Sequence, residues 1–254
     1  MSYDPWGNPR KYRKEVCMDI MQEYGIVARL ADCYDMPSST YTTTGCALAE
    51  KKVYKDIKEG FILDYQMDIR NPGSQYTKLL QICSGSMKRN ERDEDTLVLR
   101  SSKDEALRDI VAGTSDRVVV FCQYRASIDR VASIARKMGL DPLVYDGRTK
   151  DKNCYLEFQK GRYDMFIGQY SSGGVGIDLF SSHTMVLFEP TLSALQLEQT
   201  VARIMRKGQT QNCTYHYLTT PDTIEDKVWD LVRRGRDVSN DTLRALALGL
   251  EIPM

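Results

Sequence analysis

Apolar, strand-like runs alternate with helical periods over the second half of the chain. The run "DRVVVFCQY" (116–124) is rich in β-branched residues and bounded by charge, which is typical of a buried parallel strand. Further strands are expected in "DPLVYDG", "YDMFIGQY", "TMVLFEP" and "QNCTYHYLT", with helical patterns between them. Repeated strand–helix alternation predicts an α/β domain with a parallel sheet. We place its start near residue 114 and expect it to end at residue 254, with closing helices in "DTIEDKVWDLVRRG" and "VSNDTLRALALG".

Residues 1–113 show a different pattern. The first forty residues are rich in turn formers and charge, and "EVCMDIMQEYGIVARL" fits either an amphipathic helix or a helix followed by a strand. Apolar residues then recur at helical spacing, at Leu48, Val53, Ile57 and Phe61. Further helices are expected in "YTKLLQICSGSM", ending at Gly85, and in "SKDEALRDIVAG", with a serine cap and a glycine stop. We therefore expect residues 1–113 to be mainly helical.

The overall charge gives no sign of a nucleic-acid or membrane surface. Lys plus Arg and Asp plus Glu balance at 35 each, and 42% of the residues are hydrophobic. A local basic patch remains possible, but the net charge lends it no support. No apolar stretch approaches 18 residues and the N-terminus is polar, so we expect a cytoplasmic protein without a membrane span.

The cysteines do not form a metal-binding pattern. The chain has seven, at positions 17, 33, 46, 83, 122, 154 and 213, with no CxxC pair, and neither of the two histidines has a cysteine at metal-ligand spacing. Several lie in apolar runs, as Cys122 does. We therefore expect reduced thiols that pack as small hydrophobic groups, and no metal site.

A glycine-rich stretch follows one of the predicted strands. In "GQYSSGGVGIDL", Gly173, Gly174 and Gly176 would let the backbone approach an anion, and Asp178 could accept a hydrogen bond from a ribose hydroxyl. The plainer alternative is a tight turn that needs positive φ. The dinucleotide fingerprint GxGxxG is excluded, because Leu179 stands where its last glycine would be.

Two arginines follow in "QTVARIMRKGQ". If this stretch is helical, Gln199, Arg203 and Arg206 share one face. Arginine is permanently charged and forked, which suits the oxygens of a transferring phosphoryl group. A solvated basic face is the plainer alternative. The chain contains no GxxxxGK[ST], the usual cradle of a nucleoside triphosphate.

Five segments of the second half occur in a recognisable order. They are "RVVVFCQYRASIDRVASIA", "VYDGRTKDKNCYLEFQKG", "GQYSSGGVGIDL", "QTVARIMRKGQ" and "YHYLTTPDTIEDKVWDLV". They resemble motif IV, the next "DG…F" segment, motif V, motif VI and the closing strand and helix of the second RecA-like lobe of SNF2-type DNA translocases, within superfamily 2 helicases. Each match alone is weak, whereas the ordered set is specific. It covers about residues 117–232 and implies a RecA-like parallel sheet flanked by helices.

The resemblance assigns roles by position. Arg203 and Arg206 match the motif VI arginines, which face the ATP γ-phosphate across the cleft between two lobes. Gln199 and Gln209 match the glutamines of the same motif.

Motif V couples the nucleotide to nucleic-acid backbone contacts, and Gly174, Gly176 and Asp178 match it. Family members often have Ser-Thr where Gln169 and Tyr170 stand here, which puts that DNA contact in doubt. They often have Asn in place of Asp178, but superfamily 2 relatives with "GID" keep the Asp. A ribose contact by Asp178 therefore stays a hypothesis.

Upstream segments resemble the family more weakly. "YTTTGCALAEKKVYKDIKEG" and "YTKLLQICSG" look like the connection between the lobes, so residues 1–113 are expected to be an inter-lobe extension. "KDEAL" at 103–107 has letters of the magnesium-binding DEAH motif. That motif ends an apolar strand, whereas here the letters open an amphipathic helix after two serines. A capped helix is the better interpretation.

The resemblance implies half of an ATPase. The first lobe of such enzymes supplies the phosphate cradle and the magnesium-binding acid, and the second supplies arginine fingers. We expect the chain alone not to hydrolyse ATP, and ATP with Mg²⁺ to bind only when a first lobe, in the same protein or a separate chain, completes the site. The alternative is a non-catalytic DNA- or protein-binding module. Intact Arg203 and Arg206 favour the motor.

DNA contacts are expected at loops after the strands, mainly to phosphate. The candidates are Gln123, Tyr124, Arg148, Ser171 and Ser172. The "RRGR" stretch at 233–236 could brace DNA or the partner lobe, although a solvated helix end is the plainer alternative.

Overall fold

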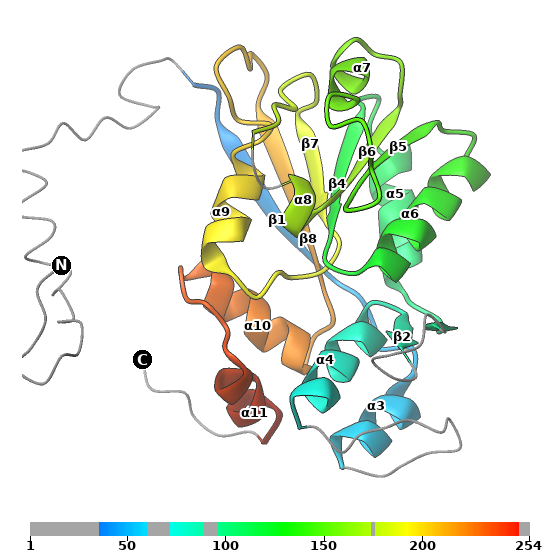
Figure 1. The fold of residues 1–254 in the computed structure, drawn as a ribbon, viewed down its shortest axis with the longest axis vertical. Coiled ribbons are helices and arrows are strands. Elements are labelled where there is room, and N and C mark those ends of the chain that lie inside the picture. The colour runs from blue at the N-terminus through cyan, green and yellow to red at the C-terminus, as the bar shows by residue number, and fades with distance from the viewer. Residues whose placement is uncertain (1–35, 60–71, 89–95, 174–175, 249–254) are drawn as a thin grey trace, which may run out of the picture. The chain divides into compact units, whose positions relative to one another are not determined.

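Six parallel strands form the central sheet of the computed structural model (Figure 1). The strands are β1 (Ser39–Gly45), β4 (Val118–Cys122), β5 (Pro142–Tyr145), β6 (Met165–Gln169), β7 (Thr184–Leu187) and β8 (Cys213–Thr219). Their order is β1-β8-β7-β4-β6-β5, and every neighbouring pair is parallel. The predicted α/β fold with a parallel sheet is confirmed. The structure describes residues 36–59, 72–88, 96–173 and 176–248.

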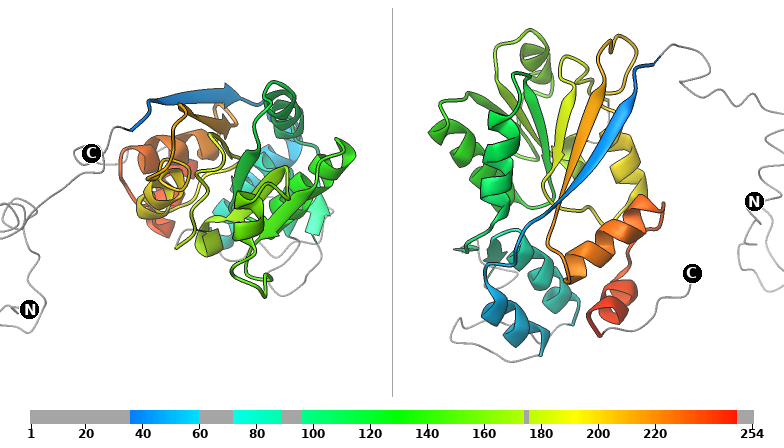
Figure 2. Two further views of the ribbon diagram at one scale, coloured as in Figure 1. Left: turned by 90° about the horizontal axis from the view of Figure 1, so that it is seen from above. Right: turned by 180° about the vertical axis from the view of Figure 1, so that it is seen from behind.

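Helices connect the strands and cover both faces of the sheet (Figure 2). They are α5 (Lys103–Ala112), α6 (Arg125–Lys137), α7 (Tyr155–Gln159), α8 (Tyr170–Gly173), α9 (Ala194–Val201), α10 (Ile224–Arg233) and α11 (Asn240–Leu248). Before them come α3 (Lys51–Lys58), α4 (Pro72–Cys83) and an antiparallel pair, β2 (Ser86–Lys88) and β3 (Thr96–Val98). None of the described helices is long and apolar enough to cross a membrane.

Alternation along β4 divides the core into two parts. Val118 and Val120 join one buried cluster, with side chains from α5 and α6, while Val119 and Phe121 join the other, with side chains from α4, α9 and α10. Successive side chains of a strand point to opposite faces, so a continuous apolar run serves both clusters.

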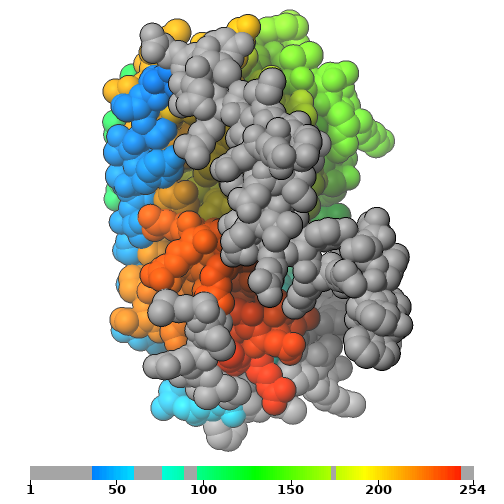
Figure 3. Space-filling model, turned by 90° about the vertical axis from the view of Figure 1, so that its left-hand side faces the viewer, coloured from blue at the N-terminus to red at the C-terminus, as the bar shows by residue number. Residues whose placement is uncertain are grey.

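Strand β1 corrects the expected domain boundary. It comes from the segment predicted to be mainly helical, yet it pairs with β8 over its whole length, so the sheet does not begin near residue 114. Tyr41 stacks on Tyr215 with ring centroids 4.9 Å apart, and Thr42 Oγ1 lies 2.9 Å from His216 Nδ1. The strand "STYTTTG" is mostly exposed at the sheet margin (blue in Figure 3), so it carries no apolar alternation that sequence reasoning could detect.

The structure also bears on the predictions for the N-terminal segment, for "KDEAL" and for the cysteines. Residues Pro37–Met254 form one compact unit, so the described part of 37–113 belongs with the α/β domain. "KDEAL" opens helix α5, as predicted, with Ser102 as the N-cap residue. The side chain of Ser102 makes no capping hydrogen bond, and the Ser101 hydroxyl accepts from the Lys103 amide at 3.3 Å. The described cysteines are free, and all but Cys154 are buried. The predictions for residues 15–30, Phe61, Cys17 and Cys33 lie outside the described residues.

A buried ion pair joins three elements below the carboxyl edge of the sheet. Lys103 Nζ, at the start of α5, lies 2.5 Å from Glu225 Oε1 in α10 and donates to the carbonyl of Phe188 at 2.8 Å. Both side chains are fully buried. Burial alone would lower the pKa of Lys103, but the carboxylates of Glu225 and Glu189 raise it above its ordinary value. The ammonium group therefore stays charged inside the protein.

We expect Lys103→Met to lower the free energy of unfolding by about 3–5 kcal/mol, because it leaves the Glu225 carboxylate buried without its cation. The double variant Lys103→Met/Glu225→Leu should recover most of that loss, since it removes both charges. Urea unfolding of the three proteins tests this. Arg100→Ala, which breaks an exposed pair with Glu50, is the control and should change stability by less than about 1 kcal/mol. A Lys103→Met protein as stable as the control variant would contradict the argument.

Candidate functional site

Residues 177–182, which begin within the predicted motif V (168–179), are bonded to residues 203–209 of the predicted motif VI (199–209). Arg203 accepts from the Leu179 amide at 2.9 Å through its carbonyl and donates from Nη1 to the carbonyl of Ile177 at 3.2 Å. Arg206 Nε lies 3.2 Å from Asp178 Oδ1. At the far end, Gln209 Nε2 donates to the carbonyls of Phe180 and Ser182. Arg203, Arg206 and Gln209 thus each contact residues of the 177–182 segment, and we call this unit the V–VI clasp.

The sequence analysis predicted that Gln199, Arg203 and Arg206 share one helix face, and this prediction is wrong. Helix α9 ends at Val201, so only Gln199 is helical, and Arg203 and Arg206 lie in the turns that follow. The amide of Arg203 bonds to the carbonyl of Thr200, three residues back, and so tightens the last turn. The tertiary bonds of the clasp replace the helical bonds that the local sequence would otherwise make.

The two arginines differ in exposure. Arg203 is only 4% exposed, and burial, together with the nearby Arg206, lowers its pKa below the ordinary value. The side chain of Arg206 is 40% exposed although its Nε atom is buried, so its exposed surface belongs to other atoms. Of the two arginine side chains, Arg206 is therefore the one that solvent reaches.

The glycine stretch begins as a short helix. Ser171 and Ser172 lie on α8, directly after β6, and Ser171 is exposed. Gly174 lies outside the described residues. Gly176 has φ +78°, and a Cβ added there would meet no atom within 4 Å. The backbone conformation, and not crowding, therefore explains this glycine, which agrees with the turn alternative.

A family model covers most of the residues that form this site. Residues 102–208 match the family of the helicase conserved C-terminal domain. The chain is 29% identical to the DNA repair protein rhp54 of Schizosaccharomyces pombe over 121 residues, which are 46% of this chain and 14% of rhp54.

Two solved structures share the fold. The C-terminal part of the Fun30 ATPase domain superposes with a TM-score of 0.61 at 15% identity, over 84% of this chain and 96% of that one. The SWI2/SNF2 ATPase core of Sulfolobus solfataricus, solved with double-stranded DNA, superposes with a TM-score of 0.62 at 22% identity, over 92% of this chain and 54% of that one. The chain is thus similar to the C-terminal lobe of SNF2-like superfamily 2 helicases, and it shares their fold. It spans between 10% and 36% of the length of the first curated relatives it matches.

A buried glutamate that the sequence analysis missed organises the carboxyl edge of the SNF2-like lobe. Glu189, only 1% exposed, follows β7, and its Oε1 accepts from the backbone amides of Gln123 (2.9 Å) and Tyr124 (2.8 Å). Its Oε2 accepts from the Ser127 hydroxyl, and its carbonyl accepts from the Tyr170 hydroxyl, each at 2.8 Å. Burial raises the pKa of Glu189, against the opposing effect of Lys103. A charged residue directly after a buried strand was the available signal.

This network decides how the predicted DNA residues of the lobe are held. Gln123 and Tyr124 are brought to the same edge as α8, because Glu189 and Tyr170 tie the ends of β4, β6 and β7 together. The ring of Tyr124 packs against the core, so its aromatic surface serves packing.

Arg148 is already engaged by two carboxylates. Its guanidinium bonds to Asp129 at 2.7 and 3.1 Å and to Asp146 at 2.9 Å, and these partners raise its pKa further. A phosphate would have to displace both carboxylates, which argues against the predicted DNA contact.

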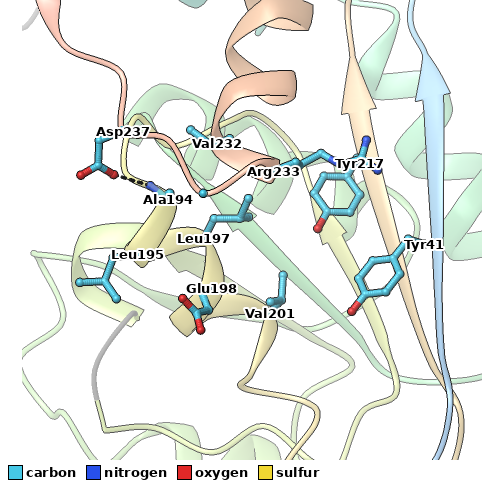
Figure 4. A pocket seen from close by; sticks show the side chains of 11 residues that line it. Tyr41, Ala194, Leu195, Leu197, Glu198, Val201, Tyr217, Val232, Arg233 and Asp237 are labelled. Carbon is cyan, nitrogen blue, oxygen red and sulfur yellow. Dashed lines mark hydrogen bonds between the residues drawn. The ribbon is translucent and has the colours of Figure 1, made fainter. Parts of the chain in front are cut away.

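A pocket of about 570 Å³ lies between β1, β8, α9 and α10 of the lobe (Figure 4). None of the residues predicted to bind ATP or DNA lines it. Arg233, from the "RRGR" stretch, lies over the Tyr217 ring at 4.7 Å and donates to Thr43 Oγ1 at 3.3 Å. Asp237 accepts from the Ala194 amide at 2.7 Å. Arg233 therefore covers an aromatic ring and is more than a solvated helix end.

Gln209 is a buried clamp whose loss should weaken the V–VI clasp. We expect Gln209→Ala to lower the free energy of unfolding by about 1–3 kcal/mol, because the backbone carbonyls of Phe180, Ser182 and Ile204 lose their donor in a buried place. Urea unfolding measures the change. The exposed neighbour Gln211→Ala should stay within about 0.5 kcal/mol of the wild type. Equal effects of the two substitutions would show that the amide does not clamp.

Proposed function

We propose that the chain is the second lobe of an SNF2-type, DNA-dependent ATPase that moves along or remodels DNA. The observation that carries this proposal is the V–VI clasp, because it presents Arg206 at the surface of a lobe with the helicase C-terminal fold. The proposal concerns the complete ATPase, and it rests on the similarity of this chain to one part of longer relatives.

Arg206 would stabilise charge on the leaving γ-phosphoryl group. Its guanidinium is permanently charged, and its outer nitrogens can bond two phosphate oxygens at once. Arg203 is held inside the clasp, so it acts on phosphate only if its side chain leaves the Ile177 carbonyl. We assign it first to holding the clasp together.

The remaining ATP-site roles belong to a first lobe. The chain has no GxxxxGK[ST] cradle, and its exposed carboxylate at the clasp, Asp178, already pairs with Arg206. We therefore propose that Mg²⁺ and most of the triphosphate are bound by the first lobe, in the same protein or in a separate chain. This lobe alone should not turn over ATP, and Gln199, partly exposed on α9, would lie beside the nucleotide only in the complete enzyme.

Turnover in a mixture tests the proposal. ATP hydrolysis should appear when this chain and a first-lobe polypeptide carrying the phosphate cradle are combined with duplex DNA, and not with this chain alone. Arg206→Ala should lower kcat about a thousandfold or more, because an arginine finger contributes on that scale. Arg162→Ala removes an arginine that is more exposed and paired with Glu157, so it is the matched control and should leave kcat unchanged.

The outcomes separate the two candidate functions. Turnover by this chain alone would contradict the division into two lobes. No turnover in the mixture, combined with salt-sensitive DNA binding by this chain, would favour the non-catalytic binding module.

DNA contact by this lobe is proposed at the end of β6. Ser171→Ala/Ser172→Ala should weaken DNA affinity by a similar factor on unrelated duplex sequences, since phosphate contacts carry no sequence information. Arg148→Ala should change affinity by less than about twofold, because Asp129 and Asp146 already occupy its guanidinium. Fluorescence anisotropy at several salt concentrations measures both. A larger loss for Arg148→Ala than for the serine variant would reverse this assignment.

A further inference from the structure

The V–VI clasp contains a carboxylate that is in contact with the proposed arginine finger. Asp178 Oδ1 lies 3.2 Å from Arg206 Nε, and the carboxylate is 55% exposed. The sequence analysis had linked Asp178 to the ribose of ATP, a role that would need the same carboxylate. The two roles make different predictions about the reaction.

Backbone bonds on both sides of Asp178 fix its position. The carbonyl of Ile177 accepts from Arg203, and the amide of Leu179 donates to the Arg203 carbonyl at 2.9 Å. The carbonyl of Asp178 itself accepts from Gln159 Nε2. The carboxylate is therefore carried on a segment that is tied to Arg203 on both sides, at Ile177 and Leu179, and to Gln159 of α7 at Asp178 itself.

The contact with Arg206 is made at the inner side of the guanidinium. Nε is buried and lies 3.2 Å from Asp178 Oδ1, without a hydrogen bond to it in this geometry. The carboxylate beside Nε attracts the guanidinium electrostatically and restrains its position, which would leave the outer nitrogens for a phosphate. We propose that Asp178 is a positioning residue that orients Arg206 toward the γ-phosphate, and that it does not bind the ribose.

This inference rests on the proposed function, but its first test needs only this chain. Arginine-selective ¹⁵N NMR should show that exchange of the Arg206 Hε proton is about two- to fivefold faster in Asp178→Asn than in the wild type, because the neighbouring carboxylate repels the hydroxide that catalyses exchange. Arg206→Lys assigns the signal. Asp230→Asn breaks the Arg234 pair, which has the same exposed carboxylate fraction of 55%, and should leave Arg206 unchanged. Unchanged exchange in Asp178→Asn would overturn the inference.

Kinetics of the combined lobes provide the second test. Asp178→Asn should lower kcat about ten- to a hundredfold with little change in KM, because a misoriented finger loses stabilisation only in the transition state. Asp178→Glu should recover part of the loss. In an Arg206→Ala background, Asp178→Asn should have no further effect, since the two residues act as a unit.

Nucleotide analogues distinguish positioning from ribose binding. With 2′-deoxy-ATP and with 3′-deoxy-ATP, the loss caused by Asp178→Asn should equal the loss with ATP. If the loss disappears with either analogue, Asp178 binds that hydroxyl and the inference is wrong. If Arg206→Ala abolishes turnover while Asp178→Asn changes kcat less than twofold, the inference fails and the proposed function stands. If Arg206→Ala has no effect on turnover, the proposed function itself fails.

Discussion

The buried pair of Lys103 and Glu225 is the constraint on which the rest of the lobe depends. Its charges cannot be hydrated, so α5, α10 and the end of β7 must meet at a fixed place for the ammonium and the carboxylate to find each other. Glu189 adds a second carboxylate nearby and binds the backbone of residues 123 and 124. Electrostatics thus fixes the carboxyl edge of the sheet, while apolar packing fixes its faces.

This edge and the V–VI clasp each hold a different part of the lobe in place. The edge holds the ends of β4, β6 and β7 in register, and with them the loops proposed to meet DNA. The clasp holds residues 203–209 against residues 177–182, which continue from the glycine stretch after α8. A displacement of one segment would be passed to the other through these hydrogen bonds, which gives a physical basis for the proposed link between DNA contact and Arg206.

The sequence could predict what local pattern encodes. Buried strands such as β4 are continuous apolar runs, and the arginines belong to one of five segments whose order along the chain is specific. It could not predict that Arg203 is buried and Arg206 exposed, because that difference arises from bonds to residues more than twenty positions earlier in the chain. Strand β1 escaped notice since Thr and Ser at an exposed margin show no alternation. Glu189 escaped because only the assembled strand ends reveal its partners.

The position of β1 also has a consequence for how the protein is made. Its partner strand lies far along the chain, as shown by Thr42 and His216, which are 174 residues apart. At the usual pace of translation, β1 leaves the ribosome roughly 10–35 s before β8 exists. A strand that waits this long with bare backbone groups could pair with another chain. The hydroxyl-rich sequence "STYTTTG" is mostly exposed in the fold, so the polarity that concealed the strand from sequence reasoning also leaves the waiting strand with few apolar groups for another chain to bury.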